Sequence, residues 1–246
     1  MFARALSALT LVVLSLVTAH AADSTPVKIA VIGDSTVCEY PQDSPSRGWG
    51  HFIGEYFQEN VKIVNLAASG RSTKTFIGEG RWAKTLAEQP QFILIQFGHN
   101  DSHAKDHPEA TDAATDYRDY LRRYVSEARA INAVPVFVTP MQRRNYKPDG
   151  SLDDILLPYA DAMKAVGAEL HVPVVDLHEM SGALYLQLGP EKSLELANKP
   201  GDATHFGEKG ARAMAELVMS KLPGAVSELQ PLLKADARKA GGPKAP

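Results

Sequence analysis

Three polar residues in this sequence are of the types that together form an activated nucleophile. Ser35 follows the apolar run of residues 27–32 and the pair Gly33-Asp34, and far downstream Asp202 and His205 stand three positions apart. A serine hydroxyl is a weak nucleophile until a base removes its proton. Within one turn, an aspartate can accept the Nδ1 proton of a histidine and leave Nε2 free as that base. Each residue alone is equally typical of a turn or a helix cap, so the hypothesis rests on the set.

The apolar runs along the chain predict a parallel sheet that would position these side chains. Short runs rich in valine and isoleucine are typical of strands buried on both faces. Helices are expected where apolar residues recur every three or four positions. The strands are predicted at residues 27–33, 61–66, 92–97, 134–139 and 172–177, and the helices at 48–59, 112–131, 153–170 and 208–222. Strands alternating with helices predict an α/β fold, a three-layer α/β/α sandwich around a five-stranded parallel sheet, in a flavodoxin-like arrangement.

Polar, glycine-containing segments follow the first three predicted strands. They contain Ser35, Gly70 and Asn100. Because the carboxyl ends of parallel strands meet at one edge of the sheet, and ligands of open α/β folds bind beyond that edge, the three segments are expected to converge there. The segment with Asp202 and His205 precedes the last predicted helix and is expected to complete the site.

The chain ends predict an exported protein with one folded domain. Arg4, an apolar run over residues 5–18 and the small-x-small sequence Ala19-His20-Ala21 are typical of a cleavable signal peptide, and the run is shorter than the roughly 20 residues that span a bilayer. We therefore predict a signal peptide at residues 1–21, a single domain at 22–230 and a disordered tail at 231–246, rich in lysine, alanine, glycine and proline. The expected location is secreted or periplasmic.

Composition narrows the possible partners. The formal net charge is −3, which gives no general attraction to nucleic acid or to anionic membranes. Cys38 is the one cysteine, so an internal disulfide is impossible and the apolar core must hold the fold alone. With 44% hydrophobic residues in 246, a single α/β domain can bury enough surface to do so. The oligomeric state is left open by the sequence.

Taken in order, four segments resemble the motifs of the SGNH (GDSL-type) hydrolase superfamily. They are Gly33-Asp34-Ser35, then Gly70, then Gly98-His99-Asn100-Asp101, then Asp202-Ala203-Thr204-His205. The resemblance implies a nucleophile at Ser35 and a base at His205 oriented by Asp202. It also implies an oxyanion hole formed by the amides of Ser35 and Gly70 and the side chain of Asn100. This chemistry needs neither a cofactor nor a metal.

Finer features are similar to rhamnogalacturonan acetylesterases and their bacterial relatives. They are Thr36 directly after the nucleophile, the segments of residues 47–50 and 65–72, and the loop of residues 143–150. That resemblance implies an esterase that removes acetyl groups from the galacturonic acid residues of pectin through an acetyl-enzyme. The expected partner is therefore an acetylated polysaccharide or oligosaccharide.

Three other functions remain open at this point. An esterase acting on acetylxylan or another glycan would share every motif. A lysophospholipase or thioesterase of the same superfamily would need an apolar groove for an acyl chain. A catalytically silent glycan-binding protein would be expected to lack a residue of the triad or oxyanion hole, and none is missing here.

Two side chains are candidates for substrate contacts. Arg71 borders the predicted oxyanion segment, and a guanidinium group suits a uronate carboxylate. Trp82 has an indole that could stack on a sugar ring or pack beneath a helix. Further basic residues with the same possible role are expected on the solvated surface: Lys74, Arg81, Arg143 and Arg144.

A histidine run after the third predicted strand has the spacing of metal ligands on one helical face. His99, His103 and His107 recur every four residues. However, Gly98 and Pro108 bracket the run, which directly follows a strand, so we predict a solvated loop and no metal site.

Overall fold

The computed structural model describes residues 26–240. The predicted signal peptide at residues 1–21 and residues 241–246 of the predicted tail lie outside this part of the chain.

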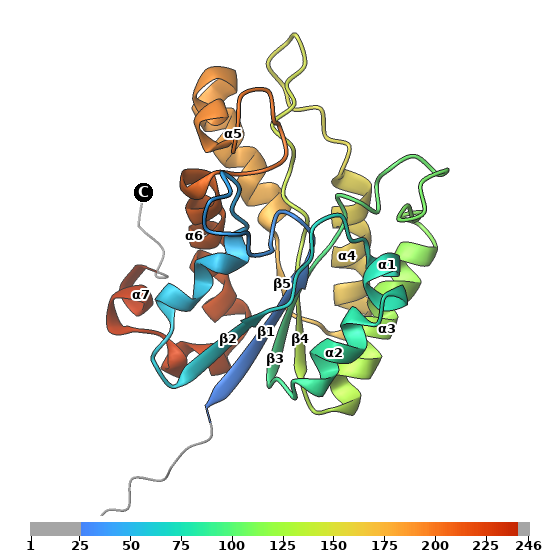
Figure 1. Cartoon of the computed structure of the whole chain (residues 1–246), viewed down its shortest axis with the longest axis vertical. Helices are drawn as coiled ribbons and strands as arrows, with labels where there is room; N and C mark the ends of the chain where they lie inside the picture. The colour runs from blue at the N-terminus through green and yellow to red at the C-terminus, as the bar shows by residue number, and fades with distance from the viewer. Residues whose placement is uncertain (1–25, 241–246) are drawn as a thin grey trace, which may run out of the picture.

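The predicted fold class is confirmed. A five-stranded parallel sheet has the strand order β2-β1-β3-β4-β5. Helices cover both faces, which gives three layers (Figure 1). The strands are β1 Val27–Gly33, β2 Val61–Asn65, β3 Phe92–Gln96, β4 Val134–Val138 and β5 Val174–Val175. β1 lies inside the sheet, so the segment that follows it reaches the middle of the carboxyl edge.

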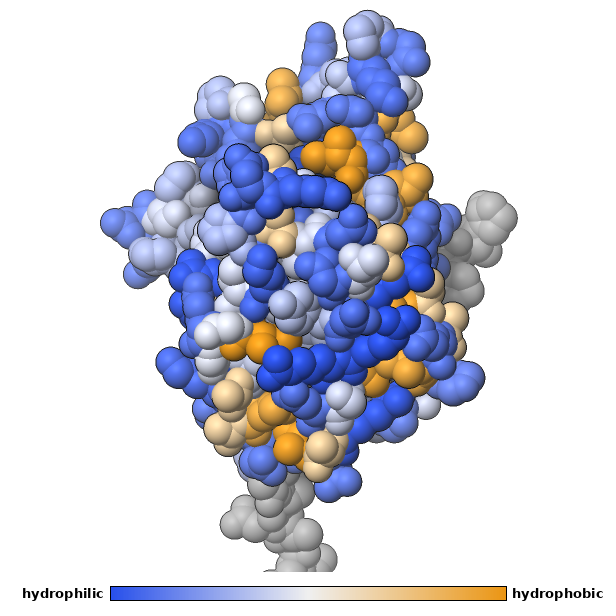
Figure 2. All heavy atoms as spheres, turned by 90° about the vertical axis from the view of Figure 1, so that its right-hand side faces the viewer, coloured by the Kyte–Doolittle hydropathy of each residue, from blue (hydrophilic) through white to orange (hydrophobic). Residues whose placement is uncertain are grey.

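One face of the sheet is covered by four α-helices, and the other by two longer ones. The first set is α1 Thr73–Gly78, α2 Arg81–Ala87, α3 Asp116–Ala130 and α4 Leu157–Leu170. The second is α5 Leu177–Ser193 and α6 Glu208–Ala225, packed with the 3₁₀ turns η1 Trp49–His51 and η2 Ile53–Tyr56. The outer surface of the first set is mostly hydrophilic, with apolar side chains in small separate groups (Figure 2). Amphipathic helices therefore bury the sheet as their spacing predicts.

Two predicted elements differ in form. The helix expected at residues 48–59 is the pair of short turns η1 and η2, although Trp49 and Phe52 are buried as predicted. Glycine disfavours helix. A Cβ on Gly50 would lie 2.7 Å from the carbonyl oxygen of Val37, so the backbone at Gly50 packs against Val37 too closely for a side chain. β5 is shorter than predicted because the Asp176 side chain accepts the Glu179 N–H and caps α5, which the apolar pattern did not reveal.

The predicted disordered tail is wrong for residues 231–240. The turn η4 Ser227–Leu232 and the helix α7 Ala235–Ala240 end the described chain. Leu233 is buried and forms an antiparallel bridge with Phe57, and the Gln58 side chain donates to the carbonyls of Pro231 and Leu233 at 2.8 and 3.0 Å. Apolar anchoring thus overrides the polar composition that suggested disorder.

Between residues 26 and 240, no helix combines the length and the apolar character needed to cross a membrane.

Candidate active site

Ser35, His205 and Asp202 form one hydrogen-bonded row at the carboxyl edge of the sheet. The Ser35 Oγ lies 3.0 Å from His205 Nε2, and His205 Nδ1 lies 2.9 Å from Asp202 Oδ2. The chain separation from Ser35 to His205 is 170 residues, so only the fold brings them together. This geometry allows His205 to take the Ser35 proton while Asp202 orients the imidazole.

Backbone contacts set the shape of the segment that carries the base. The second oxygen of Asp202 accepts the N–H groups of Thr204 and His205, at 2.9 and 2.8 Å. Burial opposes ionisation of this carboxyl, but those N–H groups and the imidazole hold its pKa below the usual value. Asp202 therefore stays a carboxylate, the form that accepts the Nδ1 proton of His205.

Asp34 holds the turn that presents Ser35. Its Oδ1 accepts the N–H and the hydroxyl of Thr36 at 2.8 and 2.7 Å. Gln96 at the end of β3 donates to the same Thr36 hydroxyl at 2.7 Å, so the turn is fastened to the neighbouring strand. A Cβ on Gly33 would lie 2.5 Å from the Gln96 carbonyl oxygen, which explains the glycine before the turn. Asp34 is thus tied down by hydrogen bonds, as expected of a residue that shapes the nucleophile turn.

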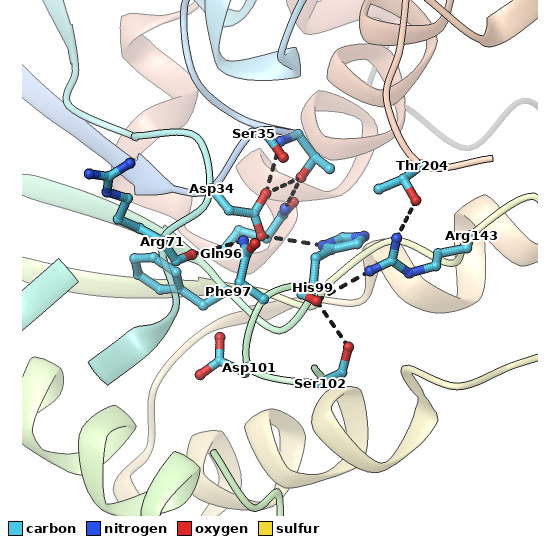
Figure 3. Close-up of polar contacts among 12 residues, drawn as sticks. Asp34, Ser35, Arg71, Gln96, Phe97, His99, Asp101, Ser102, Arg143 and Thr204 are labelled. Atoms are coloured by element: carbon cyan, nitrogen blue, oxygen red, sulfur yellow. Dashed lines mark hydrogen bonds and ion pairs between the residues drawn. The ribbon is translucent and has the colours of Figure 1, made fainter. Parts of the chain in front are cut away.

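The solvated histidine loop predicted at residues 99–107 is wrong for His99. This residue is buried, and its Nδ1 lies 3.3 Å from Asp34 Oδ2 (Figure 3). Burial lowers the pKa of His99, which favours the neutral imidazole. Burial opposes ionisation of Asp34, but His99 and the two Thr36 donors hold its pKa below the usual value. The pattern in sequence missed this contact because it joins loops after different strands.

Asn100 lies against the segment that contains Gly70. Its Nδ2 donates to the backbone carbonyl of Arg71 at 3.1 Å, and Asn100 is buried. Gly70 has a φ of +78°, a backbone conformation that glycine adopts without strain. The Asn100 amide carries a second N–H besides the one that the Arg71 carbonyl accepts, and this N–H is the predicted oxyanion donor. The loops of all three predicted donors thus meet at one edge, and their role in an oxyanion hole remains a prediction.

Asp101 anchors the same loop from within the protein. Its carboxyl accepts the N–H and hydroxyl of Thr73 at the start of α1, and the hydroxyl of Thr111. Tyr159 on α4 donates to the Asp101 carbonyl at 3.0 Å. Burial raises the pKa of Asp101 to about 7 despite the hydrogen bonds that oppose the shift. Because Asp101 directly follows Asn100, these contacts with α1 and α4 also fix the position of Asn100.

Of the two predicted substrate contacts, Trp82 lies in the core, whereas a contact from Arg71 stays a prediction. Trp82 is buried, its Nε1 donates to Glu127 at 2.8 Å, and its ring packs edge-on against Tyr124, so the sugar-stacking interpretation is wrong and the helix-packing one agrees with the structure. Helix packing of α2 on α3 accounts for this indole. Arg71 is partly exposed and donates to Glu79 and to the Ser69 carbonyl at 3.0 and 2.6 Å.

Two arginines predicted as surface charges belong to the site. Arg144 is buried and donates to the carbonyls of Asp202 and His205 at 3.0 and 2.7 Å. Its guanidinium carbon also lies 4.5 Å from the centre of the Phe206 ring. Arg143 contacts Thr204 and His99 (Figure 3). The signal available in the sequence was their position just after a strand and Pro140, at the predicted ligand edge.

His103, His107 and Glu109 form the one group in residues 26–240 with the composition of a metal site. Their ligand atoms lie within 4.8 Å of one another on the loop after β3. Glu109 Oε1 lies 2.6 and 3.3 Å from the Nδ1 atoms of the two histidines, and His103 lowers the pKa of this carboxyl by hydrogen bonding. The two histidines and Glu109 are thus linked by direct contacts, and the absence of a metal site here stays a prediction.

Comparison with known proteins places this site in a family context. Residues 31–213 match the GDSL-like lipase/acylhydrolase family. A rhamnogalacturonan acetylesterase of Bacillus subtilis is 40% identical over 209 residues, which are 78% of this chain and 88% of that protein. A probable rhamnogalacturonan acetylesterase of the same species is 39% identical over 77% of this chain and 89% of its own length.

A solved structure confirms the architecture. The protein YXIM of Bacillus subtilis superposes with a TM-score of 0.70 and 26% identity over 84% of this chain. This chain spans 57% of the length of that protein. The shared part is the α/β fold that carries the site described above.

Proposed function

Since the chain belongs to the GDSL-like lipase/acylhydrolase family, we propose that it is a secreted serine esterase that removes O-acetyl groups from acetylated rhamnogalacturonan. The serine mechanism is supported by the row of hydrogen bonds from Ser35 through His205 to Asp202. The acetylesterase class rests on the two relatives that bear that name. Export rests on the composition of residues 1–21.

The reaction proceeds in two halves. His205 takes the Ser35 proton as Oγ attacks the acetyl carbonyl carbon, and the oxyanion forms against the amides of Ser35 and Gly70 and the side chain of Asn100. His205 then gives the proton to the departing sugar oxygen. In the second half, His205 deprotonates water, which attacks the acetyl-enzyme and releases acetate while Ser35 regains its proton. Asp202 stabilises the imidazolium that forms in each half.

Acetate release from three substrates tests this proposal. We expect rapid release from acetylated rhamnogalacturonan, slower release from acetylated xylan and negligible hydrolysis of a long-chain acyl ester. Faster turnover of acetylated xylan would reassign the glycan and leave the esterase chemistry intact. Preference for the long-chain ester would instead assign the chain to the lipid-acting part of the family.

Arg71 supports recognition of an acidic glycan in this proposal. Arg71 and Arg81 share Glu79, with contacts of 3.0 and 2.6 Å, so this surface carries one more positive than negative group. Arg71→Gln should therefore raise KM for acetylated rhamnogalacturonan by up to about fivefold, because a partly exposed ion pair contributes up to roughly 1 kcal/mol. Hydrolysis of 4-nitrophenyl acetate, which has no carboxylate, should be unchanged.

Two neighbouring substitutions sharpen the test of Arg71. Glu79→Gln frees Arg71 from its partner and should lower KM for the acidic glycan. Arg81→Gln removes the same charge farther from the Ser69–Gly70 segment and should have a smaller effect than Arg71→Gln. Equal losses on glycan and small ester after Arg71→Gln would show that this arginine is structural.

A further inference from the structure

Arg143 joins the two loops whose relative position decides whether the ester can react. Its Nη2 donates to the carbonyl of His99 at 3.2 Å, and its Nη1 donates to the hydroxyl of Thr204. His99 directly precedes Asn100, and Thr204 directly precedes His205. One guanidinium group therefore contacts the residue before the predicted oxyanion donor and the residue before the predicted base (Figure 3).

The surroundings of Arg143 distinguish it from a surface charge. Most of its side chain is enclosed, and burial lowers its pKa while the carboxylates of Asp34 and Asp202 raise it. An arginine remains protonated in proteins, so a full positive charge lies between the nucleophile turn and the base segment. Holding this charge inside the protein costs free energy. The compensating contacts are those with the two loops.

The loop with His99 and the segment with His205 are each also held by another side chain. Arg144 fixes the base segment through the carbonyls of Asp202 and His205, and Ser102 donates to the same His99 carbonyl at 3.0 Å. Each of these contacts supports one of the two loops and does not reach the other. Arg143 contacts both loops with one guanidinium group, whose planar fork holds its two nitrogen atoms at a fixed separation.

Building on the proposed esterase function, we propose that Arg143 is a positioning residue that sets the oxyanion donor Asn100 at its working distance from the base His205. It does so through its hydrogen bonds to His99 and Thr204. Misplacing a reacting or stabilising group by about 1 Å can cost on the order of a hundredfold in rate. Arg143 is thus expected to act on kcat through both loops, and substrate binding should depend on it little.

The test uses Arg143→Lys and Arg143→Ala, with 4-nitrophenyl acetate as a small neutral ester. Lysine keeps the charge but reaches one loop only, so both variants should lose about tenfold to a hundredfold in kcat, with KM changed little. Methylguanidinium added to Arg143→Ala should restore part of the lost rate. Arg129, in the last turn of α3, is the matched control, because it also donates to backbone carbonyls, those of Leu170 and His171 at the end of α4. Arg129→Ala should keep its kcat and show no rescue.

A double-mutant cycle separates positioning from general stability. In the Asn100→Ala protein, the loss caused by Arg143→Lys should be at least about threefold smaller than in the parent, since coupled residues act non-additively. Equal losses in both backgrounds would overturn the proposal, as would a fall in melting temperature with unchanged kcat per folded molecule. A loss confined to KM on acidic glycan would make Arg143 a carboxylate-binding residue instead. If the parent protein hydrolyses no acetyl ester, the proposed function itself fails, which is a distinguishable result.

Discussion

Replacing Ser35 by alanine should lower kcat/KM for an acetyl ester by about a millionfold, the scale of loss expected when a serine nucleophile is removed. The reason is that alanine has no oxygen to form the acetyl-enzyme, so only hydrogen bonds to the oxyanion remain. His205→Ala should cost nearly as much, because Ser35 Oγ then loses the base that lies 3.0 Å away. The double variant should be hardly worse than either single one, since the two groups act as a unit.

Steady-state hydrolysis of 4-nitrophenyl acetate by the three variants and the parent measures these losses. The melting temperatures serve as the control for folding. Ser35 is almost fully buried but small, and His205 is partly exposed, so both single variants are expected to fold. Losses that multiply in the double variant would show that Ser35 and His205 contribute independently, against the shared proton transfer.

Asn100→Ala should lower kcat by about a hundredfold to a thousandfold, or roughly 2.7–4 kcal/mol, with KM nearly unchanged. Negative charge develops on the acetyl oxygen only as the tetrahedral intermediate forms, so a fixed donor favours the transition state over the bound ester. The Nδ2 group is held in place by its hydrogen bond to the Arg71 carbonyl at 3.1 Å. The fall in kcat of Asn100→Ala therefore measures the loss of the second N–H as a donor to the oxyanion.

Asn100→Asp separates catalysis from structure at the same position. A carboxylate has no proton to donate and would place a negative charge beside the oxyanion, so this variant should be at least as slow as Asn100→Ala. Kinetics and thermal unfolding measured on the same samples distinguish the two roles. If both variants lose stability yet keep most of their turnover per folded molecule, Asn100 only closes a turn.

Local sequence patterns predicted the sheet and the residues at its edge. Valine- and isoleucine-rich runs located the five strands between residues 26 and 240. The pairing of Ser35 with His205 across 170 residues was predicted from their residue types together with the resemblance of the four ordered motifs to a known superfamily. The strands and the loops at their carboxyl ends follow from short-range rules: strands buried on both faces are continuously apolar, and polar loops follow them. The structure differs where tertiary contacts override those rules.

His99, Trp82 and Leu233 illustrate this limit. A histidine among polar neighbours has the pattern of a solvated loop, but His99 is buried and contacts Asp34, which follows a different strand. The indole of Trp82 had two equal interpretations until Glu127 and Tyr124 on α3 placed it in the core. Leu233 is held by Phe57 and Gln58, far away in sequence. Each error concerns a contact between distant segments, which no local pattern encodes.

The most direct test of the serine mechanism is intact-mass measurement after treatment with an acetyl-mimicking organophosphonate, followed by peptide mapping. We expect a single adduct, located on Ser35, that appears in step with loss of esterase activity and is absent from Ser35→Ala. His205→Ala should react far more slowly, because the Ser35 hydroxyl then lacks its base. An adduct on another residue accompanying inactivation, or full acetylesterase activity in Ser35→Ala, would contradict it.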